Sequence, residues 1–141
     1  MIDERITDFI GKHHVLTLAT ASQGTIHCCN LFYAYMVSEN LFVVTSGADT
    51  LHARQLLGNS RVAASVVLET RTVGKVQGLQ IRGTMTRPDE ALQREARKAY
   101  LRRFPYAAVM ELELWVIRPD YLKLTDNRLG FGKKIIWEER P

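Results

Sequence analysis

The chain has few cysteines, and this scarcity narrows its class. Its 141 residues include only two, Cys28 and Cys29. Neighbouring side chains in a strand point to opposite faces, so these two thiols cannot form an ordinary disulfide with each other. Neither a disulfide framework nor a metal site is indicated, and we interpret the pair as small apolar residues in a reducing compartment. The alternative is that one of them is a reactive thiol near a ligand.

Long apolar runs are also missing. No stretch approaches the roughly 20 apolar residues that a membrane-spanning helix needs. The first residues, MIDERITDFIGKHH, carry charges and lack the continuous apolar core of a secretory signal. We therefore expect no membrane partner and a cytoplasmic location.

Neither sign of charge dominates. The 19 basic and 15 acidic residues leave a net charge of +4, and the basic ones are scattered except at 94–103 and 133–134. Nucleic-acid binding would call for a basic stripe with interleaved aromatic residues. The basic run at 94–103 is more simply a solvated helix face, so we expect no nucleic-acid partner.

Apolar periodicity predicts a mainly β domain over residues 1–141 with helical inserts. Helices are expected at 3–12, 51–57 and 88–103, and strands at 15–19, 25–36, 41–44, 62–68, 76–86, 112–118, 121–124 and 133–137. Pro119 is expected to break the chain between two of these strands. Short turns at 22–24 and 38–40 favour an antiparallel barrel over a doubly wound sheet. Its apolar outer face would need a cover, which predicts a homodimer.

The long strand at 25–36 is expected to be covered on both sides. Alternation places Asn30 on one face, with Cys28 and Phe32, and Cys29 and Leu31 on the other, with the two tyrosines that follow. Both faces are largely apolar.

The turn after strand 41–44 carries the strongest chemical signal. Thr45, Ser46 and Thr50 offer hydroxyl groups next to the free N–H groups of a helix start, and His52 and Arg54 follow within one turn. Such a helix start can hold an anion.

The alternative for the same turn is a helix cap without a ligand. Asp49 or Thr50 would then cap the helix, and His52 and Arg54 would be solvated. A similar choice exists at Gln80, in the middle of strand 76–86, which either faces solvent or lines a pocket.

Several segments carry a resemblance to a known family. These are NLFYAY at 30–35, ARKAYLRRFP at 96–105 and LGFGKKIIW at 129–137, together with the strand, turn and helix of 41–68. With them the chain resembles the flavin-binding split-barrel proteins related to pyridoxamine phosphate oxidase, and among these a small bacterial group, the YhbP-like proteins.

The resemblance implies a split-barrel homodimer with FMN at the interface. Residues at the positions of Thr45, Ser46, Thr50 and His52 would hold the flavin phosphate, and Gln80 would face the cofactor. The strand around Cys29, Asn30 and Leu31 would run along the isoalloxazine ring. Many relatives carry Lys or Arg where this chain has His52, and a neutral imidazole attracts a phosphate less than a permanent cation does.

Two functions follow from these observations. The first is an FMN-dependent oxidoreductase acting on an unknown small molecule, in which the flavin supplies the redox chemistry. The second is a non-catalytic module that carries flavin or haem. No catalytic side chain stands out, because His27, Tyr33 and Tyr35 are equally well explained as half-buried strand residues. We expect the chain to be too short to supply the substrate groups of a pyridoxamine phosphate oxidase, so that activity is not carried over.

Overall fold

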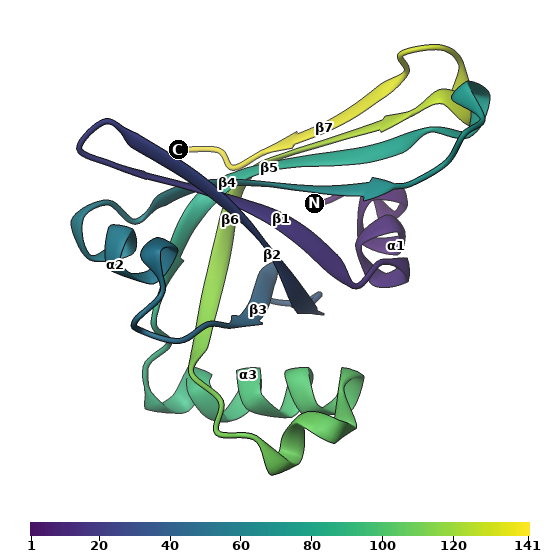
Figure 1. Ribbon diagram of the computed structural model, residues 1–141. Coiled ribbons are helices and arrows are strands. Elements are labelled where there is room, and N and C mark those ends of the chain that lie inside the picture. The colour runs from purple at the N-terminus through teal and green to yellow at the C-terminus, as the bar shows by residue number, and fades with distance from the viewer.

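One antiparallel sheet organises the chain in the computed structural model, which describes all residues from 1 to 141. Its strands are β1 Val15–Ser22, β2 Thr25–Met36, β3 Leu41–Thr45, β4 Arg61–Leu68, β5 Gln77–Thr86, β6 Leu114–Asp126 and β7 Lys134–Glu138. The strand order is β3-β2-β1-β4-β5-β6-β7, and β3 also pairs with β6 (Figure 1). This extra pairing closes a barrel, and β7 is added outside the closed ring.

Three α-helices and three short 3₁₀ helices connect the strands. They are α1 Glu4–Lys12, α2 Leu51–Gly58, α3 Glu90–Arg103, η1 Val73–Lys75, η2 Pro105–Val109 and η3 Asn127–Leu129. The predicted helices are thus confirmed. None of the helices has the length and apolar character needed to cross a membrane.

Local capping explains where two of the helices begin. The Asp3 carboxylate accepts a hydrogen bond from the Arg5 backbone N–H at 2.9 Å, and the Asp89 carboxylate accepts one from the Leu92 N–H at 2.8 Å. These bonds satisfy donors that lack an intrahelical partner. α3 ends at Arg103, because the next residue, Phe104, precedes Pro105 and is disfavoured in the helical conformation.

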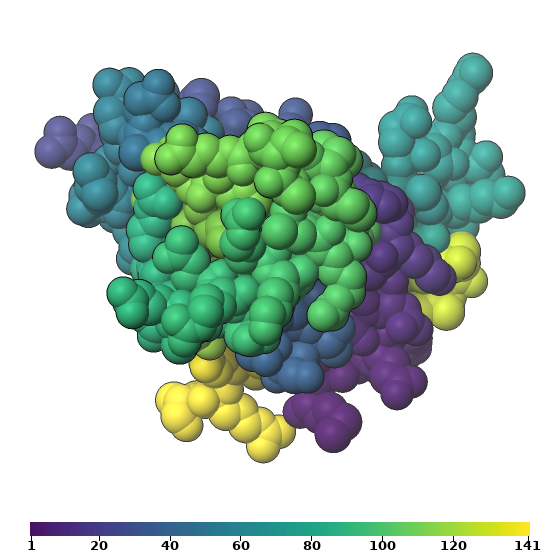
Figure 2. Space-filling view, turned by 90° about the horizontal axis from the view of Figure 1, so that it is seen from below, coloured from purple at the N-terminus to yellow at the C-terminus, as the bar shows by residue number.

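The apolar residues form two cores. The larger core fills the barrel and includes Ile6, Phe9 and Ile10 of α1, which closes one end. The smaller core lies between α3, η2 and the outer side of β3 and β6, where Val43 and Val116 are buried. β3 is therefore buried on both faces. Figure 2 shows α3 and η2 covering this end of the molecule, with the segment around η1 projecting to one side.

The expected break at Pro119 is wrong. β6 runs without interruption from Leu114 to Asp126, because its register against β5 shifts between Arg82 and Gly83, opposite Pro119. A bulge is one of the few places where a strand tolerates a proline, since the missing N–H is not needed there. The continuous β6 carries β5 and β7 beyond the barrel as a projecting arm (Figure 1).

The expected cover on both faces of β2 is present only at the end of the strand, where Ala34 is buried in the smaller core. Cys28 and Asn30 are exposed, and Phe32 is 51% exposed. The alternation itself is confirmed, because Tyr33 is fully buried and Cys29 and Leu31 pack against the barrel core. The outer face stays open toward the start of β2, because α3 reaches only the end of this strand, next to β3.

Candidate functional site

The turn between β3 and α2 is organised by Thr50. Its backbone is extended, and its hydroxyl accepts a hydrogen bond from the Ala53 N–H at 3.3 Å and donates one to the Gly47 carbonyl at 2.8 Å. The prediction of a helix cap at Thr50 is confirmed. The cap also fixes the direction of the hydroxyl, since both of its bonds are made within the turn.

Three polar side chains converge at this helix start. The Ser46 hydroxyl lies 3.4 Å from the Thr50 hydroxyl and also bonds to Nε2 of His52. The Thr50 hydroxyl is 3.2 Å from the same nitrogen. We call Ser46, Thr50 and His52 the cradle. Thr45, the last residue of β3, is half-buried next to it in the chain.

His52 is not solvated, contrary to what a simple cap would imply. Its side chain is only 7% exposed, and its ring stacks on that of His27 of β2. Burial lowers the pKa of His52, and the neighbouring His27 lowers it further. The imidazole is therefore neutral at neutral pH, whereas Arg54 is exposed, as the cap interpretation predicted.

Gln55 fixes the helix that carries His52. Its side-chain carbonyl accepts a hydrogen bond from the Thr20 hydroxyl at 2.6 Å, and its amide donates to the Thr25 carbonyl at 3.1 Å. Both partners belong to the β1 and β2 hairpin, so α2 is tied to the barrel by buried polar bonds. The amide orientation follows from these two partners.

The other side of the turn is held by β6 and the residue before it. The indole N–H of Trp115 donates to the Ser46 carbonyl at 3.1 Å. Glu113 contributes twice, since its carbonyl accepts from the Ser46 N–H at 3.0 Å and its carboxylate accepts from the Ala48 N–H at 2.9 Å. The turn thus has fixed partners on both sides, which favours a preorganised site.

The β2 residues expected along a flavin ring divide between two faces. Cys29 and Leu31 point toward the barrel core, and burial raises the pKa of the Cys29 thiol, which keeps it protonated. Asn30 points outward, and its side-chain carbonyl accepts a hydrogen bond from the Thr17 hydroxyl at 2.8 Å. A single ligand could therefore contact all three only through the backbone of β2.

Gln80 lies on the same outer face as Asn30. The register pairs Asn30 with Thr17, Thr17 with Ser65 and Ser65 with Gln80, so these four residues form one row across four strands. We call this the outer polar row. All of its members are exposed and uncharged. The structure therefore places Asn30 and Gln80 apart from the inward-facing residues of β2.

The two alternatives for Gln80, that it faces solvent or that it lines a pocket, both apply in part. Its side chain is exposed, yet it also lines a shallow groove of about 450 Å³ with Arg82, Tyr121 and Lys123. The Arg82 guanidinium lies 4.0 Å from the centre of the Tyr121 ring. The outer face next to Gln80 is thus lined by two cations.

Sequence reasoning did not find Gln55, Glu113 or Trp115 as supports of the turn. Gln55 has only a local signal, as a polar residue on the buried side of a short helix. Glu113 and Trp115 are more than 60 residues away from their partners. No spacing rule connects them, because their proximity depends on the β3 and β6 pairing that closes the barrel.

The sequence matches the family described as "Pyridoxamine 5'-phosphate oxidase" over residues 2–125. The chain belongs to this family. It is also 39% identical over 132 residues to the UPF0306 protein YhbP of Escherichia coli O157:H7, covering 94% of this chain and 90% of that protein. The YhbP protein of Salmonella arizonae has the same identity and coverage. The resemblance to the YhbP-like group is thus confirmed.

Solved structures support the fold. A FAD-binding protein from Mesorhizobium loti has a TM-score of 0.68 at 18% identity, with 86% of this chain and 90% of that chain covered. A FAD-binding protein from Mycobacterium smegmatis has a TM-score of 0.67 at 15% identity, covering 88% and 94%. A heme-binding protein from the same organism has a TM-score of 0.73 at 20% identity, covering 89% of this chain and 52% of the other. This chain therefore spans about half the length of that heme-binding protein.

Proposed function

We propose that this chain is an FMN-binding oxidoreductase that works as a homodimer on a small-molecule substrate. The observation that carries the proposal is the cradle, where two hydroxyls and one imidazole nitrogen converge at the start of α2. The membership in the pyridoxamine 5'-phosphate oxidase family supports the choice of a flavin. The FAD-binding proteins of similar fold support it as well.

The donor set of the cradle fits a phosphate monoester. Ser46 can donate its hydroxyl proton, Thr50 can donate its own once it gives up the Gly47 carbonyl, and the first turn of α2 contributes backbone N–H groups at the positive end of the helix. A phosphate would replace the contacts that Ser46 and Thr50 now make with His52 Nε2. The supports from Trp115 and Glu113 involve backbone groups, so they would remain in place.

His52 is the chargeable member of the cradle. In its neutral form it can offer one N–H, and in its protonated form it adds a positive charge. Because the pKa of His52 is lowered, a bound phosphate either raises this pKa so that the ring takes up a proton, or contacts a neutral ring. The proposal therefore implies that phosphate binding and His52 protonation are linked.

The flavin would supply the redox chemistry, and this chain would bind it, orient it and exclude water. Tyr33 and Tyr35, two candidates for acid or base groups, already use their hydroxyls in hydrogen bonds within the chain. The Tyr33 hydroxyl donates to the Ile10 carbonyl at 2.7 Å, and the Tyr35 hydroxyl bonds to the Asn40 side chain at 2.7 Å. Burial raises the pKa of Tyr35 to about 12. Both are better explained as structural groups than as proton donors to a substrate.

The outer polar row supports the homodimer. Asn30, Thr17, Ser65 and Gln80 are exposed but carry no charge, and exposed Phe32 and Val15 pair on the adjoining strands. An uncharged row that adjoins exposed apolar residues is typical of an interface between chains, and Arg82 and Lys123 lie at its edge next to Gln80. A second copy would also cover the part of the outer face of β2 that stays exposed at Cys28 and Asn30.

A visible absorption spectrum tests the proposal. The protein is mixed with FMN, freed of excess cofactor and then treated with NADH or NADPH without oxygen. We expect a retained flavin spectrum that bleaches with one of the nicotinamides. Absence of any retained flavin contradicts the proposal.

The second candidate is a carrier that binds flavin without turning it over. It is favoured by the commitment of Tyr33 and Tyr35 to structural bonds, which leaves few groups for proton transfer. A carrier would retain the flavin in the same experiment but would not support its reduction by either nicotinamide.

A further inference from the structure

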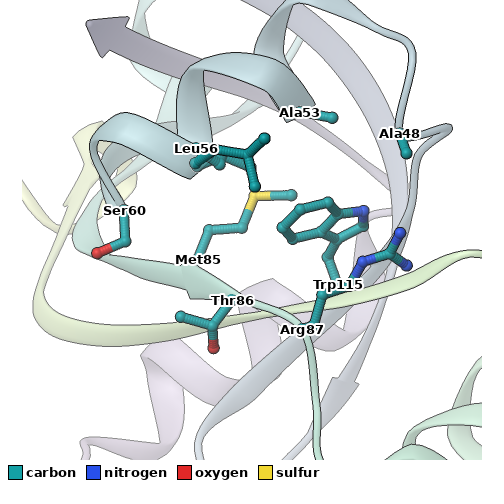
Figure 3. Close-up of a pocket in the computed structure, with 9 residues that line it drawn as sticks. Ala48, Ala53, Leu56, Ser60, Met85, Thr86, Arg87 and Trp115 are labelled. Atoms are coloured by element: carbon teal, nitrogen blue, oxygen red, sulfur yellow. The ribbon is translucent and has the colours of Figure 1, made fainter.

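A cleft next to α2 has walls suited to a second ligand. It has a volume of about 350 Å³ and lies between α2, the end of β5 and the start of β6. Figure 3 shows the indole of Trp115, the sulfur of Met85 and the side chain of Leu56 facing one another around it. A volume of this size is near the lower end of small-molecule sites, so it suits a ligand of one or two rings.

The walls are apolar and include an aromatic face. Trp115 and Met85 form the floor of the cleft and are almost fully buried, at 5% and 1% exposed, with the Arg87 guanidinium over the Trp115 ring. Ala53 and Leu56 complete the wall formed by α2. A flat, apolar ring would therefore lie with one face against this apolar floor.

The mouth of the cleft carries a cation. The Arg87 guanidinium carbon lies 4.5 Å from the centre of the Trp115 ring. One of its nitrogens donates to the Leu114 carbonyl at 3.4 Å, and another lies 3.8 Å from the Glu113 carboxylate. A guanidinium has five N–H donors, so several remain available. The Glu113 carboxylate is also held by the Ala48 N–H, and its 3.8 Å pairing with Arg87 is long, so an added carboxylate competes with Glu113 for the guanidinium through closer, bidentate hydrogen bonds.

We propose that this cleft binds a small planar organic anion, such as an aromatic carboxylate. The ring lies against Trp115 and Met85, and the carboxylate bonds to Arg87 at the mouth. Ser60 and Thr86 line the same cleft and provide hydroxyls for further polar groups of the ligand.

The cleft is separate from the cradle, and the proposal does not depend on a flavin. Ala53 and Leu57 line the cleft, whereas His52 and Gln55 lie on the adjacent side of α2. Trp115 connects the two sites, since its ring lines the cleft and its N–H supports the Ser46 carbonyl. The Trp115 indole N–H is thus a natural reporter of occupancy.

The test follows that N–H by ¹⁵N-resolved NMR. The chain has two tryptophans, so Trp137→Phe leaves a single indole signal. The probe is 2-naphthoate, and the neutral alcohol 2-naphthylmethanol is the uncharged comparison. We expect a saturable shift with 2-naphthoate and at least roughly tenfold weaker binding of the alcohol.

Charge variants separate the role of Arg87 from general effects. Arg87→Gln should weaken 2-naphthoate binding by roughly tenfold without affecting the alcohol, whereas Arg87→Lys should retain most of the affinity. Arg118→Gln is the matched control, since Arg118 is exposed on β6 and does not line the cleft. Equal affinity for both probes, or no saturable shift, overturns the proposal. A shift of the Trp115 indole signal that follows protein concentration and not ligand concentration also overturns the proposal, because a second copy of the chain would then cover the cleft.

Discussion

His27 and His52 face each other with their rings nearly parallel, at 7° between planes and 6.3 Å between centroids. His27 belongs to β2 and His52 to α2, so the pair spans the junction of the barrel and the helix. A proton on His52 would sit in a buried site next to a second imidazole. This arrangement is why the pKa of His52 is lowered.

The first prediction concerns stability in mild acid. Because the pKa of His52 is lower in the folded chain than the unfolded value of about 6.5, the unfolded chain takes up the proton first as the pH falls. The free energy of unfolding should therefore decrease as the pH drops below about 6.5. His13, whose pKa burial also lowers, contributes in the same direction. Urea unfolding over a pH series should show a shallower decrease in His52→Gln, and an equal slope in both proteins would contradict this assignment.

The second prediction links FMN affinity to the protonation of His52. His52→Lys carries a permanent cation, so it should bind FMN more tightly than the natural chain at about pH 8. The difference in affinity should narrow only as the pH falls below about 6.5 into the range where His52, with its lowered pKa, gains a proton. A ratio of the two affinities that stays constant with pH would remove His52 from the phosphate site.

The third prediction tests the bulge in β6. A Cβ added at Gly83 would lie 2.3 Å from the Arg118 carbonyl oxygen, and backbone at that position cannot easily move. Gly83→Ala should therefore cost about 2 kcal/mol or more of the free energy of unfolding. Gly74→Ala is the control, since nothing lies within 4 Å of its added Cβ, and its change should stay within about 0.5 kcal/mol. Similar values for the two variants in urea unfolding would show that the bulge tolerates a side chain.

The fourth prediction concerns the homodimer. Ser65 occupies the outer polar row on β4, so Ser65→Arg would place an unpaired charge in the proposed interface. The cost should be about 3 kcal/mol or more, which would convert dimers to monomers in sedimentation at low protein concentration. Ser38→Arg, in the exposed turn after β2, should leave the dimer intact. A natural chain that is monomeric at all concentrations would contradict the interface.

Much of the fold could be predicted from local patterns. The alternation in β2 and the helical stripe of Ile6, Phe9 and Ile10 gave the correct elements, because each depends on neighbouring residues. Pro119 shows the limit of this reasoning. A proline in a strand looks like a break until the opposing strand is known, and here Gly83 provides the space for a bulge.

The candidate site was only partly predictable for the same reason. Hydroxyls at a helix start are visible as a local pattern, and Thr50 indeed caps α2. The burial of His52 was not visible, since it depends on a hairpin that brings His27 over the helix. The position of Gln80 in one row with Asn30 depends on the pairing of four strands, which no single segment specifies.

The most direct test of the phosphate cradle compares FMN with riboflavin, which lacks the phosphate. Titration calorimetry of the natural chain should give at least roughly tenfold tighter binding of FMN, because the cradle contributes charge-assisted hydrogen bonds to the phosphate. The double variant Thr50→Ala with His52→Ala should bind both flavins alike while remaining folded. If the natural chain does not distinguish FMN from riboflavin, or if the double variant keeps the full preference for FMN, the cradle is not the phosphate site.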